Sequence, residues 1–141
     1  MDVDLKFTIV AQNPTVEFLG GTQTRNVVTV GFITDGHGIY GEARVIASIY
    51  SANEARHAAL GVVVALETVA SLPNVAGVEW GQSVNKSGLL VDQITVTVES
   101  DSGDSTALYG PVAISALGAD ARAPEIAALA KALTDAEGPS G

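Results

Sequence analysis

The sequence predicts one α+β domain in which an antiparallel sheet packs on two helices, the first of them central. Strand-like segments rich in β-branched residues precede each of two segments with helical spacing. The stretch 28–35 is echoed by 94–101, and 52–56 is echoed by 118–122, in both cases 66 residues further along the chain. These observations predict two pseudo-repeated halves of the form βββ(β)α.

The halves are placed at about 1–72 and 73–137, with a flexible tail at 138–141. A chain of 141 residues can bury about 68–70% of the surface that it exposes when unfolded. Each half would be marginally stable alone, so a shared core is the easier outcome. A further echo, between Ile39-Tyr-Gly41 and Leu108-Tyr-Gly110, has a larger offset and predicts a three-residue insertion in the second hairpin.

Strands and turns alternate through the first half. Alternating apolar residues at 3–10 predict a half-buried strand, Asn13-Pro14 predicts a turn, and 15–19 a short second strand. The segments 27–34 and 39–50 are expected to form a hairpin, with Ile39, Ala43, Val45, Ala47 and Ile49 on one face. The tip, Asp35-Gly-His-Gly38, supplies glycines for the positive φ angles of a tight turn.

The first helix is expected from about 52 to 71. Ser51 can cap it by accepting a hydrogen bond from a free backbone N–H, and Glu54 three residues later completes a capping box. Pro73 follows its end. Its middle, 60–66, is apolar nearly all round, which predicts a helix covered on most sides.

The second half repeats this order. A strand at 75–84 and a turn at 85–88 precede a hairpin of 92–99 and 106–115 around the loop 100–105. Pro111 lacks the N–H that a ladder hydrogen bond needs, so its strand is expected at a sheet edge or with a bulge. Pro124, followed by Ile126, Leu129 and Leu133, predicts a final amphipathic helix.

Composition narrows the classes of function. The longest apolar run, 58–66, is too short to cross a bilayer, which needs roughly 20 residues. The N-terminus lacks the pattern of a secretory signal, so a cytoplasmic or virion location is expected. The absence of cysteine excludes disulfides, thiolate metal sites and cysteine nucleophiles. A net charge of −9 with only seven Lys and Arg disfavours a nucleic-acid partner.

The two hairpin tips carry the first candidate site residues. His37 could be a general acid or base or a metal ligand, because imidazole titrates near neutrality, although a solvated tip is the preferred interpretation. Glu99, Asp101 and Asp104 crowd the second tip with oxygen ligands that calcium favours. The loop lacks the twelve-residue calcium pattern, so an ordinary acidic turn is preferred there.

The helix starts carry the second group of candidates. Glu54 and His57 have an i,i+3 spacing, which fits either a carboxylate–base pair or an ordinary surface pair. Arg56 and Arg122 occupy echoed positions where a cation is mildly unfavourable, so they are expected to reach a carboxylate or a partner chain. The chain has no phosphate loop, dinucleotide fingerprint, zinc-protease motif or serine-hydrolase motif, and no cofactor is expected.

Three functions follow as hypotheses. The first is a non-enzymatic structural or assembly protein that forms a homo-oligomer, for example a component of a phage virion, with other copies or subunits as partners and neither membrane nor nucleic acid. The second is a small-molecule-binding protein or enzyme with a pocket between sheet and helix lined by Tyr40, Trp80 and Tyr109, which requires His37 or His57 to converge with a carboxylate. The third is a single-stranded nucleic-acid-binding module.

The third hypothesis comes from a resemblance. Duplicated strand-rich halves that each end in a helix resemble the single-strand-binding folds of the whirly and PUR type. Such folds imply stacking of bases on aromatic side chains, of which this chain has three Tyr, three Phe and one Trp. The acidic charge and this scarcity place the hypothesis last, and an enzymatic role is also disfavoured.

Overall fold

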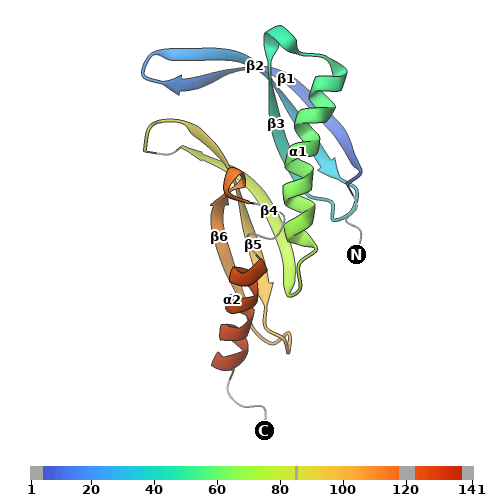
Figure 1. Cartoon of the computed structure of the whole chain (residues 1–141), viewed down its shortest axis with the longest axis vertical. Coiled ribbons are helices and arrows are strands. Elements are labelled where there is room, and N and C mark those ends of the chain that lie inside the picture. The colour runs from blue at the N-terminus through green and yellow to red at the C-terminus, as the bar shows by residue number, and fades with distance from the viewer. Residues whose placement is uncertain (1–4, 85, 118–122, 138–141) are drawn as a thin grey trace.

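The computed structural model describes residues 5–84, 86–117 and 123–137 and forms one α+β domain (Figure 1). The first sheet has the order β1 (Phe7–Gly20), β2 (Gln23–Thr34), β3 (Tyr40–Ile46), followed by a 3₁₀ turn η1 (Ala47–Ile49) and α1 (Ala52–Ala70). The second has the order β4 (Val75–Val84), β5 (Leu90–Glu99), β6 (Thr106–Ala113), followed by η2 (Ile114–Ala116) and α2 (Ala123–Ala136). The predicted fold class is confirmed, with the antiparallel sheet divided into two.

The two halves share one strand register at an offset of 66 residues. Ile9 pairs with Phe32, and 66 positions later Val75 pairs with Val98. Both β1 and β4 have a register shift directly after this pair. The equivalence therefore extends to the first strand of each half, where the two sequences show no echo.

The three-residue insertion expected in the second hairpin is wrong. Ile33 pairs with Tyr40 and Glu99 with Thr106, so the loops 34–39 and 100–105 have equal length. One extra residue enters later, where β6 shifts register opposite Ile94 and Val96. Structurally, Tyr40 therefore corresponds to Thr106, and the Tyr-Gly echo is a coincidence of sequence.

The register shift in β6 contains Pro111. It lies between Tyr109, which pairs with Val96, and Val112, which pairs with Ile94. β6 is also an edge strand. Both features predicted for the strand of this proline are confirmed, because an edge or a bulge leaves no ladder hydrogen bond for the missing N–H to make.

The turn predicted at Asn13-Pro14 is wrong. Both residues lie inside β1, where Asn13 pairs with Thr29 and Pro14 with Val28. β1 is the outer strand of its sheet, and an edge strand accepts proline because one side of its backbone needs no partner. One 14-residue strand thus replaces the two short strands that were expected; positions 3–4 of the first lie outside the described residues.

Helix α1 begins as predicted and is covered less completely than predicted. Ser51 Oγ accepts a hydrogen bond from the Glu54 N–H at 3.1 Å, and the helix ends before Pro73. Its inner side is fully buried, but Leu60 and Val64 are 38% and 40% exposed. The strand expected to reach Tyr50 ends at Ile46, so Ile49 lies in η1 and is exposed instead of packed.

One hydrophobic core joins the two halves. It contains Phe32 of β2, Leu66 of α1, Ile94 of β5 and Ile126 of α2, each fully or almost fully buried. α1 contacts strands of both sheets, including β4, whereas α2 contacts β5 and β6 (Figure 1). The central position predicted for the first helix is confirmed, and Ile126 and Ala130 form the buried side of the predicted amphipathic α2.

Candidate functional site

Two hairpin arms extend beyond the helices on one side of the molecule (Figure 1). β3 pairs with β2 only from Val27 onward, so 16–26 forms a first arm of two strands. β6 pairs with β5 only from Gln93 onward, so 82–84 and 86–92 form a second arm at the equivalent position. The arms are thus a feature of the repeat that the sequence echo did not show.

Large apolar side chains are exposed on these arms. In the first arm Phe18 is 63% and Val16 52% exposed, and in the second Val84 is 65% and Leu90 40% exposed. Phe18 pairs with Thr24, and Val84 with Leu90, at matching registers. Each arm therefore presents apolar surface at its end.

A charge network joins the arms at their bases. The Arg44 guanidinium donates from Nε to Glu17 Oε2 at 2.7 Å and from both terminal nitrogens to the Asp92 carboxylate at 3.2 and 3.0 Å. Arg25 also binds Glu17, and Gln82 donates to Asp92 at 2.9 Å. Because Glu17 lies in the first arm and Asp92 in the second, Arg44 fixes one arm against the other.

The hairpin tips are built alike but are attached to their helices differently. A buried hydroxyl organises each loop: Thr34 Oγ1 accepts from the Ile39 N–H at 2.9 Å, and Ser100 Oγ from the Ser105 N–H at 3.3 Å. The second tip is bound by the exposed Glu137, which accepts from Ser100 and Ser102. These bonds, that from Ser102 foremost, lower the pKa of Glu137 because they stabilise its charged form.

The first tip is bound by a buried carboxylate. His37 Nδ1 lies 2.8 Å from Glu67 Oε1, and the Glu67 side chain is fully buried in α1 whereas the imidazole is 46% exposed. Glu67 Oε2 has no hydrogen-bond partner among the described residues. The convergence of a histidine with a carboxylate, which the second hypothesis required, is present at His37. Its partner Glu67 was not among the candidate residues.

The sequence contains a signal for Glu67. It is the one charged residue between Ala58 and Ala70, and it lies one turn after Val63 and next to Leu66 on the inner side of α1. A charge on the core-facing side of a helix is rare unless it is paired. That position was the available signal.

An aromatic pair lies beside this tip, where β3 and β4 meet. The rings of Tyr40 and Trp80 are 6.0 Å apart with planes at 75°, and both line a hollow of about 440 Å³ with Gly38, Ile39, Val78 and Glu79. The Tyr40 hydroxyl donates to Glu42 Oε2 at 2.7 Å. This bond, together with burial and the negative charge of Glu42, raises the pKa of Tyr40 to about 12. Tyr109 packs against the core and does not line this hollow.

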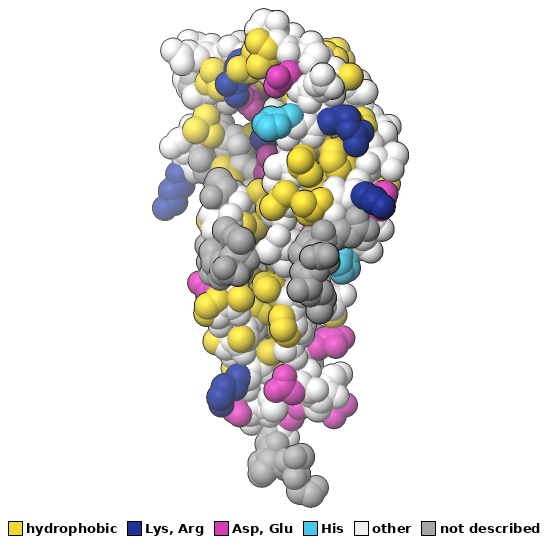
Figure 2. Space-filling model, turned by 45° about the vertical axis from the view of Figure 1, so that its right-hand side comes forward, with side chains coloured by type: hydrophobic (Ala, Val, Ile, Leu, Met, Phe, Trp, Pro, Cys, Tyr) yellow, Lys and Arg dark blue, Asp and Glu magenta, His cyan; other side chains and the backbone are white. Residues whose placement is uncertain are grey.

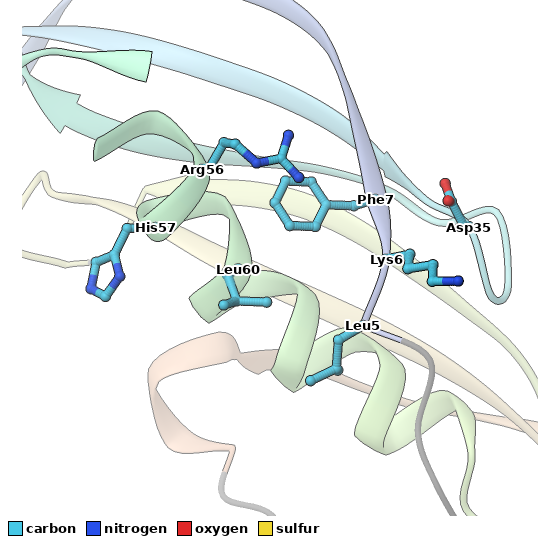
Figure 3. Close-up of a pocket in the computed structure, with 7 residues that line it drawn as sticks. All are labelled: Leu5, Lys6, Phe7, Asp35, Arg56, His57 and Leu60. Carbon is cyan, nitrogen blue, oxygen red and sulfur yellow. The ribbon is translucent and has the colours of Figure 1, made fainter. Parts of the chain in front are cut away.

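Two of the candidates at the start of α1, Arg56 and His57, line a separate hollow of about 510 Å³, and Glu54 does not (Figure 3). The Arg56 guanidinium lies 4.8 Å from the centre of the Phe7 ring, a cation–π contact and not the carboxylate contact that was one of the two expectations. The other expectation, contact with a partner chain, stays a prediction. His57 points away from that ring, and Glu54 acts through its N–H in the helix cap. Arg122 lies outside the described residues, as does the echoed segment around it.

The acidic loop of the second half is occupied with internal contacts. Asp101 accepts a hydrogen bond from Asn74 at 3.0 Å, and its N–H donates to Thr134. Across the described ranges, no three His, Asp or Glu side chains are grouped closely enough to hold a metal ion. Figure 2 shows acidic side chains gathered near the C-terminal end and hydrophobic side chains exposed above them.

No protein-family model, curated protein or solved structure matches this chain. Within the part of the chain that the structure describes, none of the helices combines the length and apolar character needed to span a membrane.

Proposed function

We propose that the protein is a self-associating structural subunit whose copies bind one another through the two hairpin arms. The observation that carries this proposal is the pair of arms, each extending past its third strand with large apolar side chains exposed. A particle built from many copies, in the cytoplasm or in a virion, is the setting that such a subunit fits.

The physics of isolated hairpins supports the proposal. A two-stranded ribbon is marginally stable in water, so arms without a covering layer gain stability when another surface covers them. β1 is also a long outer strand that pairs with only one other strand among the described residues, so a strand from another copy can extend the sheet at β1. The Arg44 network holds the arms in a fixed relation, which lowers the loss of conformational freedom on binding.

Charge sets the conditions for association. A net charge of −9 makes copies repel one another at long range, and salt screens this repulsion within about 10 Å at 0.1 M. Short-range apolar contacts must therefore supply the attraction, and association should strengthen as ionic strength rises.

Size-exclusion chromatography with light scattering tests the proposal. Phe18→Asp should shift the protein toward the monomer, because it places a charge in the proposed contact. Ile49→Asp is the matched control, since Ile49 is 57% exposed but lies in η1. A wild-type protein that stays monomeric at high concentration in both low and high salt would overturn the proposal, as would equal effects of the two substitutions.

A further inference from the structure

We propose that the corner between the Tyr40 and Trp80 rings binds an organic cation, an ammonium group carried by a small molecule or by a lysine side chain. The site is separate from the arms and does not depend on self-association. It would give the protein a ligand-binding activity in addition to assembly.

The two rings form a corner whose geometry suits a cation. The two rings are nearly perpendicular, 6.0 Å apart, and line a common hollow of about 440 Å³, large enough for a methylated ammonium group. Aromatic faces carry partial negative charge and attract a cation within about 6 Å of the ring centre. Ile39 and Val78 line the same hollow and can contact the methyl or methylene groups that such a cation carries.

Negatively charged side chains near the rings also favour a cation. Glu79 lines the hollow and Glu42 binds the Tyr40 hydroxyl, so two carboxylates lie near the rings. A phenol that donates to a carboxylate has a more electron-rich ring, which favours a cation further. Arg44, two residues after Glu42 on β3, is already bound by Glu17 and Asp92 and so does not compete for the corner.

Comparison of the halves supports a dedicated site. The residue equivalent to Tyr40 is Thr106, and the residue equivalent to Trp80 is Pro14. The corner forms where β3 of the first half meets β4 of the second, and the equivalent positions in β6 and β1 carry no aromatic side chain. The shared framework alone therefore does not account for these two rings.

Trp80 is the only tryptophan, so its fluorescence reports directly on the corner. Titration with tetramethylammonium chloride and with choline should change the emission in a saturable way, beyond the effect of sodium chloride at equal ionic strength. The neutral isostere 3,3-dimethyl-1-butanol should bind more weakly. A short peptide with one trimethyllysine, compared with the same peptide containing norleucine, tests whether a protein side chain serves as the cation.

Variants make the test specific. Tyr40→Leu should weaken cation binding roughly two- to fivefold, the range expected for one partly exposed cation–π contact. Tyr40→Phe keeps the ring and should retain most of the binding, and Tyr50→Leu is the control at an exposed tyrosine outside the hollow. Equal responses to choline and its neutral isostere would overturn the proposal. So would unchanged binding in Tyr40→Leu, or no saturable response to any of the cations.

Discussion

Replacing His37 with alanine should destabilise the protein, although the imidazole is nearly half exposed. The reason is the carboxylate that remains. Glu67 is fully buried, one of its oxygens has no partner among the described residues, and the other is bonded only to His37. Without the imidazole, neither oxygen of Glu67 keeps a hydrogen-bond partner in the part of the chain that the structure describes.

The magnitude follows from burial. Removing one partner of a fully buried ion pair costs about 3–5 kcal/mol, and leaving a buried polar group unsatisfied costs about 1–3 kcal/mol. Because His37 is 46% exposed, water can enter the space that alanine opens, so the lower range of about 1–3 kcal/mol applies. With a urea slope of about 2 kcal/mol per molar, a 2 kcal/mol loss lowers the unfolding midpoint by about 1 M.

Replacing the other partner, Glu67, should not lower the free energy of unfolding as His37→Ala does. Glu67→Met replaces the buried carboxylate with an apolar side chain of similar length, and such replacements are neutral or stabilising by about 1–4 kcal/mol. His37 then loses its partner but stays in contact with water. The double variant should therefore be more stable than His37→Ala alone, a coupling that a simple loss of packing would not give.

Urea unfolding followed by Trp80 fluorescence measures all four proteins. His57→Ala, in the other hollow, is the matched control and should change stability by less than about 0.5 kcal/mol. An unfolding midpoint of His37→Ala equal to that of the wild type would show that Glu67 does not depend on the imidazole. Destabilisation by Glu67→Met as large as that by His37→Ala would show the same.

Three further predictions concern Gly41 in the core and the shifted pKa values of Glu137 and Tyr40. Gly41→Ala should destabilise the protein by about 1–3 kcal/mol in urea unfolding, because an added Cβ would lie 2.8 Å from Phe32 Cζ and 3.1 Å from Leu66 Cδ1, whereas Gly81→Ala meets nothing within 4 Å and should be nearly neutral. Since the pKa of Glu137 is lowered in the folded state, its contribution to stability is complete above the ordinary carboxyl pKa and is lost as the pH falls through the folded value. Protection of the amides in the loop 100–105 against hydrogen exchange, taken relative to their intrinsic exchange rate at each pH, should fall over that acid range in the wild type, and Glu137→Gln should show low protection at every pH. Since the pKa of Tyr40 is raised to about 12, its contribution is complete below pH 10 and is lost as the pH rises through about 12. Ultraviolet titration should show the late ionisation of Tyr40, and Glu42→Gln, which removes the negative charge beside the hydroxyl, should shorten that delay.

The sequence predicts this fold well where local chemistry decides the structure. Gly38, with a φ of +66°, ends the first hairpin tip, and the Ser51 cap forms at the predicted atoms. Pro111 lies at both an edge and a register shift. In each case the backbone requirement of one residue type excludes most alternatives, so neighbours in the chain are sufficient to place the element.

The sequence does not predict the structure where the position and contacts of a residue depend on segments far away in the chain. Pro14 is typical of a turn, yet it is accepted within β1 because that strand has a partner on one side only. Glu67 is charged, yet it is buried because His37, thirty positions earlier, reaches it from the hairpin tip. Tyr40 and Trp80 meet because two sheets meet, and neither sheet is continuous with the other. No local pattern contains these contacts.

The two halves show how one framework produces different chemistry. In both, a glutamate from the helix region binds a hairpin tip that a buried hydroxyl organises. α2 contacts the strands of its own sheet, so Glu137 remains in water and its hydrogen bonds hold it in the charged form. α1 contacts strands of both sheets, so the same type of contact is enclosed and Glu67 depends on a single imidazole. The central position of α1, more than any difference in the loops themselves, therefore makes the first tip the place where a change of one side chain has the larger effect.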